Sequence, residues 1–97
     1  MSQSLARIIL HVVWSTKHRR PVISDIVAPS LYSYIGGILR ECDSSLVAAG
    51  GMFDYVHLLC ECSKNHGASK IVKEVKVGSS IWIKTQNAVP GDFCWQA

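Results

Sequence analysis

The stretch that decides the fold is GGMFDYVHLLCEC, residues 50–62. Its double glycine predicts a turn, and residues 52–62 are typical of a strand. Residues 44–50, SSLVAAG, predict a short strand before the turn, so the two strands should form a hairpin. Side chains at positions i and i+2 of a strand share one face, which puts Tyr55 and His57 on the same side. Two imidazoles so placed could bind one metal ion, but one of the two side chains here is a phenol.

The rest of the chain surrounds this hairpin with one strand and one helix on each side. Residues 7–16 are apolar on both alternations, which predicts a central strand covered on both faces. Residues 24–41 and 68–84 have apolar side chains at helical spacing, and residues 92–96 predict a short last strand. The order β-α-β-β-α-β predicts an α+β, ferredoxin-like fold, a four-stranded antiparallel sheet with two helices on one face.

Length and composition indicate a single globular domain over residues 1–97. Hydrophobic residues make up 48% of the chain and charged residues only 18%, so the chain is not of the disordered class. That apolar fraction is high for so small a domain, and we expect part of it to form a homodimer interface. There is no apolar run long enough for a membrane span. The net charge of +3 is compatible with a nucleic-acid partner.

The four cysteines are Cys42, Cys60, Cys62 and Cys94. Their spacing matches no zinc-binding pattern. We interpret Cys60 and Cys62, which share one face of a predicted strand, as small buried hydrophobic residues. The expected compartment is the cytoplasm.

Five motifs together resemble one protein family. The chain is similar to the single-tyrosine HUH transposases of small bacterial insertion sequences, and most of all to their REP-associated branch. The resemblance implies a dimeric ferredoxin-like protein that acts in DNA transposition, a form of DNA recombination, on single-stranded DNA with hairpin ends. It also implies a tyrosine nucleophile assisted by Mg²⁺ or Mn²⁺ at a His-hydrophobe-His motif. The motifs are HVVWSTKHRRPVI (11–23), LYSYIGGI (31–38), GGMFDYVHLLCE (50–61), VKEVKVGSSIWI (72–83) and FCWQ (93–96).

The sequence departs from this family in two places. The metal motif has Tyr55 where a histidine is expected, so His57 is its only imidazole, and we interpret the stretch as the remnant of a metal site. The chain also stops at Ala97, where the family continues into its tyrosine-bearing helix. Tyr32 and Tyr34 belong to the first predicted helix and do not replace that nucleophile. The resemblance therefore implies a DNA-binding domain that contains no catalytic residue and does not cleave.

Other candidate residues each have a plain structural interpretation and a functional one. His11 is expected to be a satisfied core histidine, although it could neighbour His57. The basic run after the first strand is either a solvated loop or a phosphate-binding patch, and Trp14 nearby favours unpaired bases. Trp82 and Trp95 are expected in the core or a dimer interface. The candidate DNA-binding residues are Lys17, His18, Arg19, Arg20 and Lys76, the last together with Ser79 and Ser80.

Three alternatives to the non-cleaving domain stay open. The chain could belong to an active transposase completed by a segment outside it or by another chain. It could be a non-catalytic regulatory domain that has kept only nucleic-acid recognition. It could also be a degraded gene product that folds and does nothing more. The sequence does not specify the DNA target.

Overall fold

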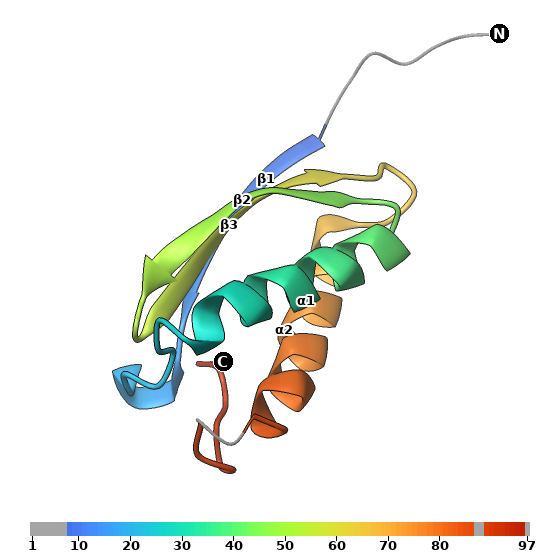
Figure 1. Cartoon of the computed structure of the whole chain (residues 1–97). Helices are drawn as coiled ribbons and strands as arrows, with labels where there is room; N and C mark the ends of the chain where they lie inside the picture. The colour runs from blue at the N-terminus through green and yellow to red at the C-terminus, as the bar shows by residue number, and fades with distance from the viewer. Residues whose placement is uncertain (1–7, 87–88, 97) are drawn as a thin grey trace, which may run out of the picture.

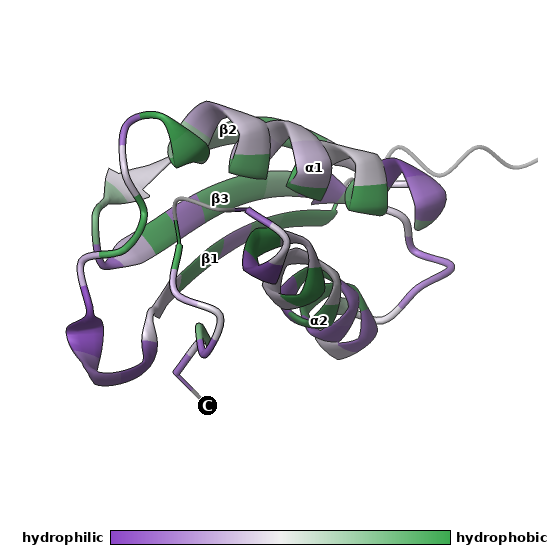
Figure 2. Cartoon of the chain, turned by 60° about the horizontal axis from the view of Figure 1, so that its bottom comes forward, coloured by the Kyte–Doolittle hydropathy of each residue, from purple (hydrophilic) through white to green (hydrophobic). Residues whose placement is uncertain are grey.

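The computed structural model describes residues 8–86 and 89–96. One antiparallel sheet forms a layer, and two helices cover one of its faces (Figure 1). Hydrophobic stripes of both helices face the sheet (Figure 2), and no helix in the described part of the chain could cross a membrane. The elements are β1 (Ile8–Ser15), the 3-10 turn η1 (Lys17–Arg19), α1 (Val27–Glu41), β2 (Ser45–Met52), β3 (Tyr55–Cys62) and α2 (Ala68–Lys84).

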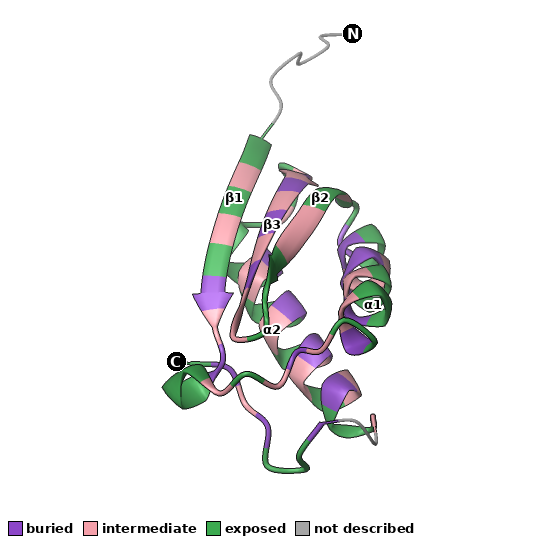
Figure 3. Cartoon of the chain, turned by 60° about the vertical axis from the view of Figure 1, so that its left-hand side comes forward, coloured by how far each residue is buried: buried purple, intermediate pink, exposed green. Residues whose placement is uncertain are grey.

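The strand order is β1-β3-β2, which puts β3 in the centre and β1 at an edge. The expectation that the first strand is central and covered on both faces was therefore wrong. Ile9 and Val13 of β1 are 51% and 60% exposed, because both helices lie against the other face of the sheet. Exposed positions recur along β1 until Trp14, which is buried (Figure 3).

The predicted hairpin forms, but its turn lies elsewhere. Strand β2 runs through Gly50 and Gly51, and the chain turns at Phe53 and Asp54. Gly51 has φ +147°, and a β-carbon there would collide with the backbone of Tyr55. The double glycine thus permits close strand pairing and does not make the turn.

The predicted fourth strand contributes only one bridge within the described residues, between Thr16 and Trp95. The Gln96 N–H donates to the Ser15 carbonyl at 2.8 Å. Upstream, the Phe93 N–H is already engaged by the Pro90 carbonyl at 3.1 Å, so the segment begins as a turn. The sheet therefore has three strands in the part of the chain described, and not the expected four.

The core lies between the helices and the covered face of the sheet. The helix predicted at 68–84 is confirmed as α2, while α1 begins at Val27 and not at residue 24. The Ser24 hydroxyl accepts a 3.2 Å hydrogen bond from the Val27 N–H and supports this start. Gly78 brings the helices together, since a β-carbon there would stand 2.7 Å from Cδ1 of Ile38. Fully buried side chains include Leu31, Ile35, Leu39, Val56, Leu58, Cys60, Ile71, Val75 and Ile83.

Candidate nucleic-acid interface

A basic turn follows β1, and its backbone conformation is unusual. His18 and Arg19 have φ of 59° and 56°, so two successive residues with side chains adopt the left-handed region. Each such residue costs about 1–2 kcal/mol, and such conformations persist where the surroundings fix them. The side chains of Lys17, His18 and Arg19 are exposed. The turn is therefore a fixed display of three basic side chains.

Thr16 is the main anchor of this turn. Its side chain is only 1% exposed, and its hydroxyl donates to the Arg20 carbonyl at 2.8 Å. Its N–H donates to the Asp54 carbonyl at 2.9 Å, and its carbonyl accepts from the Arg19 N–H at 3.0 Å. The basic turn is thereby tied to the β2–β3 hairpin turn.

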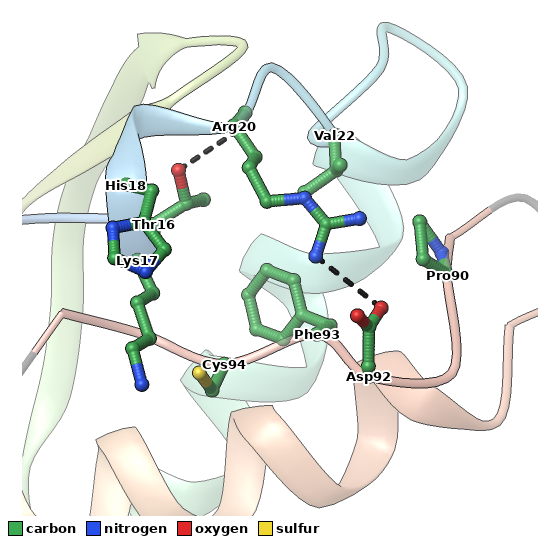
Figure 4. A pocket seen from close by; sticks show the side chains of 9 residues that line it. All are labelled: Thr16, Lys17, His18, Arg20, Val22, Pro90, Asp92, Phe93 and Cys94. Atoms are coloured by element: carbon green, nitrogen blue, oxygen red, sulfur yellow. Dashed lines mark hydrogen bonds and ion pairs between the residues drawn. The ribbon is translucent and has the colours of Figure 1, made fainter.

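Both arginines of the turn are paired with carboxylates distant in the sequence. The Nε of Arg19 lies 2.9 Å from Oδ2 of Asp54, and Nη1 of Arg20 lies 3.2 Å from Oδ1 of Asp92. Arg20 reaches Asp92 past Phe93, at a pocket of about 230 Å³ (Figure 4). These pairs are solvent-exposed and contribute about 1 kcal/mol or less to stability. They orient the two guanidinium groups without removing them from the surface.

Lys76 of α2 joins the basic turn through the C-terminal segment. Its Nζ donates to the Gln96 carbonyl at 2.9 Å and lies 5.9 Å from the centre of the Trp14 ring. The Oε1 of Gln96 in turn accepts from the His18 N–H at 3.4 Å. Residues 17–20 and Lys76 are thus brought to one end of the domain.

Ser79 does not belong to this surface. Its side chain is fully buried, and its hydroxyl donates to the Val75 carbonyl at 2.6 Å. The same hydroxyl accepts a 3.1 Å hydrogen bond from Nε1 of Trp95. Ser79 therefore anchors the C-terminal segment, and Trp95 lies in the core as one of its expected positions required.

The metal-motif position lies on the sheet face opposite the helices. Tyr55 and His57 are half-buried there, while Val56 and Leu58 between and beside them point into the core. His11 lies on the same face, and its ring centre is 5.9 Å from that of His57. His11 is exposed, so its interpretation as a core histidine was wrong.

The donor atoms at this position do not fit the Mg²⁺ or Mn²⁺ that the family resemblance implies. Hard divalent ions prefer several oxygen ligands, mainly carboxylates. Tyr55 and His57 offer one phenol and one imidazole, and His11 is the neighbouring second imidazole. No group of three or more His, Cys, Asp or Glu residues that could hold an ion occurs in residues 8–86 and 89–96.

The other tyrosines lie on α1, away from any such role. Burial, together with the nearby Tyr55, raises the pKa of Tyr32, which makes its phenolate harder to form. Tyr34 stacks on Trp82 with ring centres 5.3 Å apart. Trp82 is therefore half-buried in a helix–helix contact.

The fold and the family are those of transposases. The fold resembles a candidate transposase from Deinococcus radiodurans R1 at a TM-score of 0.77 and 26% identity, over 100% of this chain and 85% of that one. It also resembles a REP-associated tyrosine transposase solved with a REP hairpin, at a TM-score of 0.62 and 14% identity, over 100% of this chain and 62% of that one. No significant match was found among curated proteins.

The family model described as "Transposase IS200 like" matches residues 4–97. The chain therefore belongs to the IS200-like transposase family, as the five motifs predicted.

Proposed function

We propose that this transposase-family domain binds single-stranded or hairpin DNA, through Lys17, His18, Arg19, Arg20 and Lys76. The observation that carries the proposal is the clustering of these basic side chains at one end of the domain. Cations on a fixed backbone suit phosphate groups, whose contacts position a nucleic acid without reading its sequence. The REP hairpin bound by a structurally similar transposase supports a hairpin ligand.

The test is a binding titration of a fluorescently labelled DNA hairpin over a series of salt concentrations. The triple variant Lys17→Ala, Arg19→Ala, Arg20→Ala should bind more weakly, and its salt slope should fall by about two units. A control variant, Arg40→Ala, Lys64→Ala, Lys70→Ala, removes the same charge from exposed residues at the other end of the sheet. Equal loss of binding in both variants would show a non-specific charge effect and contradict the proposal.

We also propose that this chain does not cleave DNA. The support is the unsuitable donor set of Tyr55 and His57, and the engagement of Tyr32 and Tyr34 within the helical layer. On this account the family's nucleophile-bearing helix is not part of residues 1–97. The rival is an active transposase completed by a further segment, and it predicts nicking activity once that segment is supplied.

Strand order supports two further parts of the proposal. The bridge at Thr16 lies on the side of β1 away from β3, where the fourth strand of a ferredoxin-like sheet would stand. The rest of that edge, together with exposed Ile9 and Val13, supports a homodimer. Light scattering should give twice the chain mass at tens of micromolar, and a monomer mass would contradict the dimer. Free cysteines support the cytoplasm as its compartment.

A further inference from the structure

Three rings form a row on the open face of the sheet. The ring centres of His11 and His57 are 5.9 Å apart, and those of His57 and Tyr55 are 6.4 Å apart. The rings come from β1 and β3 and lie on the face that neither helix covers (Figure 1). No ring in this row is fully buried, since His11 is exposed and the other two are half-buried. The row is therefore accessible to a ligand.

The spacing of the rings suits an unpaired strand. Neighbouring bases in duplex DNA are separated by about 3.4 Å along each strand. The ring separations of 5.9 and 6.4 Å are nearly twice that value, so a strand that stacks one base on each ring must be extended. Aromatic side chains bind successive bases of single-stranded nucleic acid in this way with little sequence preference.

One end of the row meets the basic turn. Tyr55 and Arg19 line a common hollow of about 380 Å³, together with Val13, Trp14 and Ser15. Ser15 is paired with Tyr55 across the two strands, and the basic turn begins two residues further along the chain. A strand that leaves Tyr55 in this direction would bring its phosphates to Lys17 and Arg19. The charge at this end thus complements a nucleic-acid backbone.

We infer that the open face binds a segment of unpaired DNA, whose bases stack on Tyr55, His57 and His11. This inference rests on the proposed DNA-binding function and names the part of the DNA that this face recognises. Tyr55 then has a positive role, because a phenol that is a poor metal ligand is a good stacking surface. The basic turn holds the backbone of the same strand.

The experiment compares two labelled single strands of the same length, about 12 nucleotides. One is intact, and the other has abasic residues throughout its central third, so it keeps every phosphate but lacks bases to stack. The wild-type chain should bind the intact strand at least about tenfold more tightly. Tyr55→Leu should lose most of this preference and keep its salt slope, while Tyr55→Phe should keep the preference.

Equal affinity of the wild-type chain for the two strands would overturn the stacking site while leaving DNA binding intact. Failure to bind either strand or the labelled hairpin would overturn the proposed function and this inference together. The comparison on the wild-type chain decides the matter even if Tyr55→Leu does not fold.

Discussion

The Nε2 atom of His57 lies 2.8 Å from the point that a β-carbon on Gly50 would occupy. The His57 ring therefore rests over the backbone of the neighbouring strand, in space that only a glycine leaves free. This contact ties the double glycine of β2 to the row of rings on the open face. A side chain at position 50 would have to displace the imidazole.

Gly50→Ala should consequently move the His57 ring and leave the fold intact. The obstructing atoms belong to the outer part of a side chain, so we expect a loss of about 1 kcal/mol or less in the free energy of unfolding. Binding of the intact single strand should weaken, while binding of the abasic strand should not change. Imidazole proton shifts and urea unfolding measure the two effects.

Gly67→Ala is the matched control, because no atom lies within 4 Å of a β-carbon at that position. Unchanged His57 shifts in Gly50→Ala would show that the contact between the two residues is not present in solution.

Removing the carboxylate beside Arg20 should strengthen DNA binding. Asp92→Asn deletes a negative charge 3.2 Å from the guanidinium, and with it the repulsion that Asp92 exerts on a phosphate. The carboxylate is 76% exposed, so stability should change by less than about 1 kcal/mol. Hairpin titrations at low salt provide the measurement. Glu41→Gln, an exposed acid at the other end of the sheet, is the control and should have the smaller effect. Equal gains from both variants would indicate net charge alone.

Tyr55→His should create a better metal site at the family's motif position. Two imidazoles at positions 55 and 57 would lie on one face of β3, so Mn²⁺ affinity should rise about tenfold or more over the wild-type chain. Calorimetric titration measures this gain, and adding His57→Ala should abolish it.

Neither the wild-type chain nor Tyr55→His should form a covalent adduct with hairpin DNA, because the change adds no nucleophile. An adduct from the wild-type chain would overturn the non-cleaving account. Absence of any Mn²⁺ gain would mean that positions 55 and 57 do not form a chelating pair.

Stability should fall at alkaline pH because of a buried thiol. Burial, with a smaller contribution from Cys62, raises the pKa of the Cys60 thiol from 9.0 to about 11. Between these two values the unfolded chain loses the proton and the folded chain keeps it, so the free energy of unfolding decreases as the pH rises. Below pH 9 both states hold the proton, and the thiol causes no pH dependence there.

Urea unfolding at about pH 8 and about pH 10.5 tests this window. Cys60→Ala should be less stable at the lower pH, because it leaves a cavity. It should also lose less stability between the two values than the wild-type chain does. Identical losses would assign the alkaline effect to other groups.

The sequence identified both helices and the hairpin, because their apolar spacing matches the face that each one buries. It placed the hairpin turn wrongly, since glycine permits a turn but also permits the close contact between Gly50 and His57. It also gave β1 a second covered face, because apolar side chains such as Val13 occur on an open face too. The last strand failed for a related reason, as Phe93 and Trp95 are apolar to fill the core and not to extend the sheet.

Pattern and resemblance found Tyr55, His57 and the basic run of the candidate site, since each lies within a short motif. The partners that shape the site have no local signal. Asp92 meets Arg20 across 72 positions of the chain, and Gln96 meets His18 across 78. Only the folded chain brings these groups together.

The most direct test of the account is a map of backbone amide shifts when single-stranded DNA is added to the ¹⁵N-labelled chain. The account predicts the largest changes at His11, Tyr55, His57 and the Lys17–Arg20 turn. It predicts little change at Tyr34 and Ile81, whose side chains are exposed on the helices. Changes centred on the helices, with the open face of the sheet unaffected, would contradict it.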